Sequence, residues 1–235
     1  TEEKTFAYYE KLQNECGKAH VCYYKGNFNY SKINNFGVQY AKGEYLLLLN
    51  NDTEMINDDC IEELLGYCTR SDVGIVGARL YYEDDTIQHA GVVIGFGGIA
   101  GHCFVQQPRG NTGYCHRIIC AQDYSAVTAA CMMVKRSVFD EVGGLTEELA
   151  VAFNDIDFCM KVRQKGYLVV YNPYAELYHY ESKSRGLEDT PEKLERFHKE
   201  IRTFETRWPE IMKNGDPYYN PNLSLETQDF SLKRL

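Results

Sequence analysis

The first residues that could do chemistry are Asn50, Asn51 and Asp52, which directly follow the apolar run 45–49. Five apolar residues bounded by polar ones predict a short strand that is buried on both faces. Ligands of open α/β sheets bind at the carboxyl ends of the strands. Two amides and a carboxylate at such an end offer the oxygen ligands that hard cations prefer. The same residue types also close ordinary turns, so the pattern alone leaves both interpretations open.

A second candidate group is Asn154, Asp155 and Asp157, at the start of an expected helix that Gly166 ends. Carboxylates in the first turn of a helix interact favourably with its dipole, and this structural role explains either aspartate. It does not explain why both follow an aromatic residue and an asparagine after a glycine-rich turn. The segment is therefore a candidate for a functional role as well.

Two histidines and a threonine add weaker signals. His179 follows an expected strand 167–171 that Pro173 breaks, and a lone histidine there is more often structural than a ligand. His102 follows a glycine-rich stretch that predicts a mobile loop over a site. Thr128 lies among small residues, which either let a ligand approach the backbone or pack closely against a helix.

The composition narrows the class of partner. The formal net charge is -9 and no block of basic residues occurs, which argues against nucleic acid as a main partner. No apolar run has the length needed to cross a bilayer. Nine cysteines without a Cys-x-x-Cys pair fit a reduced, cytoplasmic setting.

The predicted elements alternate between helices and short strands, which is typical of an α/β domain. We expect an amphipathic helix over residues 1–16 and a helix capped by Ser31. We further expect one domain over residues 1–210, followed by an irregular extension, 211–235, packed on it.

Six short strings, in the expected order, resemble inverting family 2 glycosyltransferases of the bacterial O-antigen and rhamnan type. The strings are 28–37, 49–54, 88–93, 126–131, 153–159 and 179–186. The resemblance implies a GT-A fold, a Rossmann-like mixed sheet flanked by helices. Family members open with two strands and turns that hold the nucleotide, and these have no counterpart here. We therefore expect an N-terminally truncated domain with an incomplete base pocket and a tendency to form homo-oligomers.

The resemblance also implies roles for individual residues. Asp52 matches the last position of the family's Asp-x-Asp motif and His179 matches a late histidine, so both would bind Mn²⁺ or Mg²⁺. Asp155 is similar to the family's catalytic base. The remaining candidates would contact donor or acceptor, namely Asn50, Asn51, His102, Thr128, Asn154, Asp157 and Arg185.

The implied reaction moves a sugar from a nucleotide diphosphate sugar to a hydroxyl of a saccharide or lipid-linked saccharide, with inversion. It would serve bacterial cell-surface polysaccharide synthesis, in the cytoplasm or at the inner face of the membrane. Two alternatives stay open. One is a non-catalytic domain that binds sugar or a partner, and the other, ranked lower, is a metal-dependent hydrolase. Nucleotide-sugar consumption would distinguish the glycosyltransferase from the non-catalytic domain.

Overall fold

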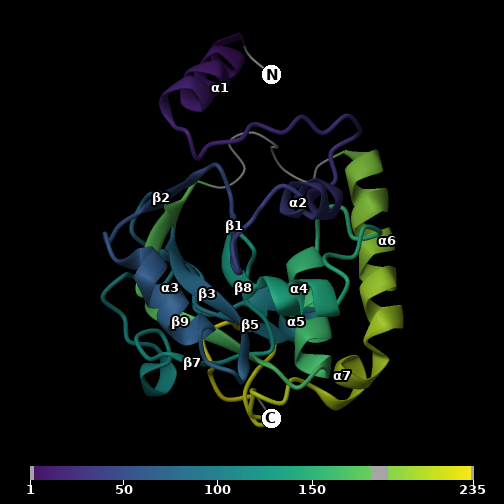
Figure 1. The fold of residues 1–235 in the computed structure, drawn as a ribbon. Helices are drawn as coiled ribbons and strands as arrows, with labels where there is room; N and C mark the ends of the chain where they lie inside the picture. Colours follow the sequence, from purple (N-terminus) through teal and green to yellow (C-terminus); the bar gives the residue numbers. More distant parts are fainter. Residues whose placement is uncertain (1–2, 181–189, 234–235) are drawn as a thin grey trace.

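A computed structural model describes residues 3–180 and 190–233. Within these residues, seven strands form one mixed sheet (Figure 1). Its main path runs through β1 (Tyr45–Leu49), β8 (Cys131–Lys135), β3 (Val73–Tyr81), β9 (Leu168–His179) and β2 (Thr53–Met55). β4 (Ile87–His89) pairs with β3, β7 (Gln122–Asp123) pairs with β9, and β5 (Val92–Ile94) with β6 (Ala100–His102) forms a separate ribbon. Only the β3–β9 pair is parallel among these strands.

Helices cover both faces of this sheet. The helices of the described residues are α1 (Glu3–Glu15), α2 (Tyr30–Val38), α3 (Cys60–Cys68), α4 (Arg136–Glu141), α5 (Asn154–Gln164), α6 (Pro191–Arg207) and α7 (Pro209–Asn214), with short 3₁₀ turns η1 (Phe96–Gly98) and η2 (Tyr114–His116). α3 lies on one face, and α4 and α5 lie on the other (Figure 1). α1 buries no residue and stands apart from the main body. No helix in the described ranges is long and apolar enough to cross a membrane.

The core consists of two apolar clusters, one on each face of the sheet. Along β8, Met132 and Val134 belong to the cluster under α4 and α5, whereas Cys131 and Met133 belong to the cluster under α3. This alternation is the period of two that strand geometry imposes. Both faces of the sheet are therefore apolar and covered, as the α/β prediction requires.

The prediction that the strand after Gly43 is buried on both faces is wrong. β1 alternates, because Leu46 and Leu48 are buried while Leu49 is 42% exposed. In the part of the chain that the structure describes, β1 pairs only with β8 and so forms an edge of the sheet. Tyr45, Leu47 and Leu49 lie on the less covered face of this strand, because successive side chains of a strand point to opposite faces.

The expected break at Pro173 is also absent, since β9 continues through it to His179. The parallel register with β3 shifts between Asn172 and Glu176, so the proline lies outside the regular ladder. A proline without an N–H is tolerated at such an irregularity. The Asn172 side chain accepts a hydrogen bond from the backbone N–H of Tyr174 at 3.0 Å. The continuation matters because it carries His179 to the far end of the sheet.

The prediction that Ser31 caps the helix over Tyr30–Val38 is wrong. Asn29 caps α2 in place of Ser31, since its side chain accepts from the Lys32 N–H at 2.9 Å. Ser31 instead donates to the Leu149 carbonyl at 2.7 Å.

The C-terminal segment contributes buried Tyr219, Leu223 and Phe230 to the core. The domain division at residue 210 stays a prediction.

We predict that Gly77→Ala lowers the free energy of unfolding by about 1–3 kcal/mol through overpacking. A Cβ at Gly77 would lie 2.5 Å from the Cβ of Val127, so the backbone or the valine must move. Urea unfolding measures the change.

The matched control is Gly66→Ala in α3, where a Cβ meets no atom within 4 Å. It should stabilise the protein by about 0.5–1 kcal/mol, because glycine is a poor helix former. A Gly77→Ala protein as stable as the wild type would contradict the close packing of β3 against Val127.

Candidate active site

The structure brings Asp52 and His179 together at one end of the sheet. β2 and β9 pair antiparallel with Thr53 opposite His179, and the Tyr180 N–H donates to the Asp52 carbonyl at 2.8 Å. As a result, Asp52 Oδ1 lies 3.3 Å from His179 Nε2. Asn50, at the end of β1, places its Nδ2 3.2 Å from the same nitrogen. Three of the residues proposed from sequence therefore meet here.

The donor set of this pair suits a divalent cation. Asp52 Oδ1 is buried and receives no hydrogen bond from the described residues, although the side chain as a whole is 24% exposed. A buried, unpartnered carboxylate oxygen is costly unless a cation or proton balances it. One carboxylate and one imidazole are compatible with Mn²⁺ or Mg²⁺. No group of three His, Cys, Asp or Glu gathers within residues 3–180 and 190–233, so waters and substrate oxygens would complete the coordination.

Asp155 lies in the first turn of α5 and is half-buried. Its Oδ2 accepts from the Ala129 N–H at 3.2 Å, and its Oδ1 accepts from the Ile156 N–H at 2.8 Å. The preceding Phe153 has a φ of 61°, a left-handed conformation that is unfavourable for a phenylalanine. Its ring packs against Phe197 and Phe204, which fixes this start of the helix.

The segment 128–130 connects Asp155 with the Asp52–His179 pair. Ala129 donates to Asp155, and the next residue, Ala130, accepts from the Asn50 N–H at 2.9 Å. Tyr30 donates its hydroxyl to the Ala129 carbonyl at 2.9 Å. Burial, and next the charge of Asp155, raise the pKa of Tyr30 above its usual range. Asp155 and Asn50 are thus bonded to neighbouring residues of the same short segment.

The family model for glycosyl transferase family 2 matches residues 2–143. The chain belongs to this family. It is 49% identical over 232 residues to the uncharacterized protein y4gI of Sinorhizobium fredii, covering 98% of this chain and 25% of that protein. It is 37% identical over 209 residues to the O-antigen biosynthesis protein RfbC of Myxococcus xanthus, covering 88% of this chain and 16% of that protein. The chain therefore spans a quarter or less of these relatives.

The fold of this glycosyltransferase family member is similar to that of a solved structure. The crystal structure of GalNAc-T7 with UDP, GalNAc and Mn²⁺ matches it with a TM-score of 0.66 and 15% sequence identity. The match covers 90% of this chain and 40% of that chain. The predicted GT-A fold and the predicted family, of O-antigen type, are confirmed.

Asp157 and Asn154 make contacts inside the domain. Asp157 is fully buried and accepts from Thr146 Oγ1 at 2.5 Å, from Arg207 Nε at 2.7 Å and from Trp208 Nε1 at 2.8 Å. These bonds attach α5 to the end of α6. The buried Asn154 donates to the Val151 carbonyl at 2.8 Å. A role of either residue in substrate binding stays a prediction.

The other predicted binding residues have different surroundings. Asn51 is exposed and Thr128 is half-buried, with its N–H 3.5 Å from His89 Nε2. His102 Nδ1 lies 3.0 Å from the Gln88 carbonyl oxygen, and its ring is 4.7 Å from that of His89. Arg185 lies outside the described residues.

Sequence reasoning missed Gln88 and Glu200 as individual site residues. Gln88 lies in 88–93, one of the six short strings that resemble the family. The string alone does not show that the Gln88 side chain contacts His179. Glu200 is 1% exposed and accepts from the backbone N–H groups of Ala150, Val151 and Ala152, just before the Asp155 helix. An acid within the apolar stripe of α6 is the signal that could have identified it.

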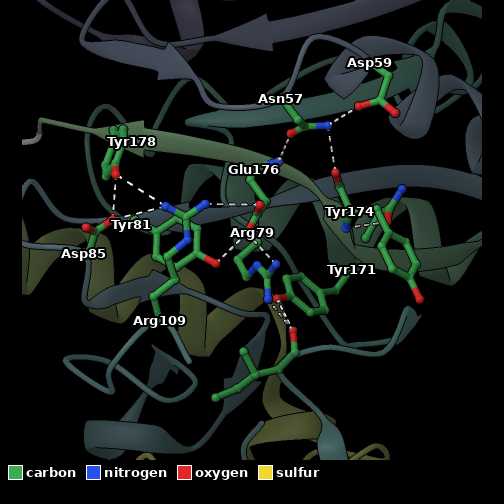
Figure 2. A network of polar contacts seen from close by, with 12 residues as sticks. Asn57, Asp59, Arg79, Tyr81, Asp85, Arg109, Tyr171, Tyr174, Glu176 and Tyr178 are labelled. Carbon is green, nitrogen blue, oxygen red and sulfur yellow. Dashed lines mark hydrogen bonds and ion pairs between the residues drawn. The ribbon is translucent and has the colours of Figure 1, made fainter. Parts of the chain in front are cut away.

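A polar network supports the end of β9 (Figure 2). Glu176 accepts from Arg79 at 2.5 Å and from Tyr81 at 2.6 Å through Oε1, while its Oε2 faces Arg109 at 3.3 Å. Arg109 also lies over the Tyr81 ring, 4.7 Å from its centroid. This network lies three residues before His179 and fixes the strand that carries it.

We predict that Asp157→Asn lowers the free energy of unfolding by about 1–3 kcal/mol, the usual cost of leaving buried groups unsatisfied. Three donor groups converge on this carboxylate, and an amide offers only one acceptor oxygen to them. Urea unfolding of the purified variant measures the loss.

Asp155→Asn is the matched control, since it makes the same change on the same helix at a half-buried position. It should be less destabilising, because water can replace a lost hydrogen bond there. The reverse order of the two stabilities would remove Asp157 as the anchor between α5 and α6.

Proposed function

We propose that this domain transfers a sugar from a nucleotide diphosphate sugar to an acceptor hydroxyl with inversion. The observation that carries the proposal is the buried Asp52 Oδ1 facing His179 Nε2 at 3.3 Å, beside the segment that binds Asp155. Membership of glycosyl transferase family 2 supports it. The name of the RfbC relative, an O-antigen biosynthesis protein, supports a place in cell-surface polysaccharide synthesis. The proposed acceptor is a saccharide or a lipid-linked saccharide.

Asp52 and His179 would bind Mn²⁺ or Mg²⁺, and Asn50 would keep the imidazole in place through its amide. A bound divalent cation supplies a Lewis acid that balances the negative charge of the leaving diphosphate. The Mn²⁺ in GalNAc-T7 supports this choice of ion. The exposed Asn51 has room to contact the donor.

Asp155 would act as the general base. As the acceptor oxygen bonds to the anomeric carbon, its proton moves to Asp155 and the bond to the diphosphate breaks on the opposite side of the sugar ring. The diphosphate leaves with the electron pair of that bond. Hydrogen bonds from two backbone N–H groups hold the carboxylate of Asp155 in place.

A domain that binds a sugar without transferring it is the second candidate. The buried Asn154 supports it, since an amide cannot act as an acid or a base and this one already donates to the Val151 carbonyl. Turnover of a nucleotide sugar decides between the two functions. Cytoplasmic location, with or without peripheral membrane association, and homo-oligomer formation also stay proposals.

We predict that Mn²⁺ at about 100 times its Kd stabilises the protein by about 2.7 kcal/mol. For a domain of this size the melting temperature should rise by roughly 5–10 °C. Differential scanning fluorimetry measures the shift, and Asp52→Ala should abolish it.

Asp58→Ala serves as the control, because Asp58 is an exposed acid nearby in the chain and should leave the shift intact. An unchanged shift in Asp52→Ala would exclude Asp52 from the cation site.

For catalysis, we predict that Asp155→Asn reduces kcat by about 10²–10⁴-fold, the usual contribution of a general base. The amide matches the carboxylate in shape, so Mn²⁺ and donor binding should change little. The assay is release of nucleoside diphosphate by the intact protein from UDP-, GDP- and dTDP-sugars with an acceptor saccharide. Full activity of Asp155→Asn would require another base, and no turnover by the wild type would favour the binding function.

A further inference from the structure

Both ends of the side-chain amide of Gln88, on β4, contact the same residue, His179. Its Oε1 lies 2.6 Å from His179 Nδ1, and its Nε2 donates to the His179 carbonyl at 3.0 Å. The side chain is buried, with 1% of the residue exposed. The two residues are 91 positions apart in the chain, so this contact exists only in the folded domain.

These two bonds determine the tautomer of His179. A carbonyl oxygen can only accept, so the NH₂ end of the Gln88 amide must face the His179 backbone. The amide oxygen therefore faces Nδ1, and Nδ1 must carry the proton. In the neutral imidazole, Nε2 is then the unprotonated nitrogen that carries the lone pair. The Asn50 amide, 3.2 Å away, can donate to it.

Asp52 favours the opposite arrangement. Its Oδ1, 3.3 Å from Nε2, is an acceptor that would draw the imidazole proton to Nε2. A proton shared by Asp52 Oδ1 and His179 Nε2 would occupy the position where a cation would bind. Two acceptors, Asp52 Oδ1 and Gln88 Oε1, thus compete for the proton of one imidazole from its two sides. The shorter distance, 2.6 Å, belongs to Gln88.

We infer that Gln88 is a positioning residue, which keeps His179 protonated on Nδ1 and presents Nε2 as a cation ligand beside Asp52. This inference rests on the proposed function, because it assumes that a divalent cation binds the pair. Groups that hydrogen-bond to a metal-binding histidine typically fix its tautomer and ring orientation. Gln88 is such a group and contacts no substrate atom in this account.

The test uses Gln88→Met, which keeps the side-chain length and removes both hydrogen bonds. Two-bond ¹H–¹⁵N spectra of histidine-labelled protein report the tautomer without any metal, and His179→Gln assigns the signal. The wild type should show His179 protonated on Nδ1. Gln88→Met should shift it towards the Nε2-protonated form and weaken Mn²⁺ binding by about 10–100-fold.

Two further variants separate positioning from general damage. Gln88→Glu should restore the Nδ1-protonated form and much of the Mn²⁺ affinity, because a carboxyl oxygen accepts from Nδ1–H. Asn172→Leu removes another fully buried amide, which bonds to the Glu63 carbonyl and the Tyr174 N–H. It should leave the His179 tautomer and the Mn²⁺ affinity unchanged.

An Nε2-protonated His179 in the wild type, or an unchanged tautomer in folded Gln88→Met, would overturn the inference about Gln88. Equal loss of Mn²⁺ affinity in Asn172→Leu would also overturn it, since the effect would then be general. Absence of Mn²⁺ binding by the wild type would instead contradict the proposed cation site, and the spectra would still show whether Gln88 sets the tautomer.

Discussion

The pairing of β2 with β9 is the constraint on which the candidate site depends. It places Thr53 opposite His179 and bonds the Tyr180 N–H to the Asp52 carbonyl. Without this register, Asp52 and His179 would be two unrelated polar residues 127 positions apart in the sequence. β9 reaches β2 only because it passes Pro173 without ending, and the Glu176 network holds the strand just before His179.

Two carboxylates of the site differ in their hydrogen bonds, and the difference suits two roles. Asp52 has a buried oxygen without a hydrogen-bond partner among the described residues, which favours a cation beside it. Asp155 accepts hydrogen bonds from two backbone N–H groups. The strained Phe153 and the buried Glu200 hold the loop from which the Asp155 helix starts. In the proposed mechanism these different surroundings would make Asp52 the cation ligand and Asp155 the base.

The sequence predicted the family, the α/β fold and most helices, because apolar periodicity and short motifs are local signals. It failed for β1 and Pro173, because burial and strand continuation depend on neighbours that are distant in the chain. It could name His179 only through the resemblance. The partner that orients this histidine, Gln88, could not be inferred, since one side-chain contact across 91 positions leaves no pattern in a single sequence.

The central claim is that His179 Nε2 and Asp52 bind the same divalent cation. Pulsed electron paramagnetic resonance of the Mn²⁺-loaded protein, with ¹⁵N-labelled histidine, measures the imidazole nitrogens bound to the ion. We expect coupling to one directly bound nitrogen in the wild type and its loss in His179→Ala. Coupling that persists in His179→Ala, or Mn²⁺ bound to the wild type with no histidine coupling, would contradict the account.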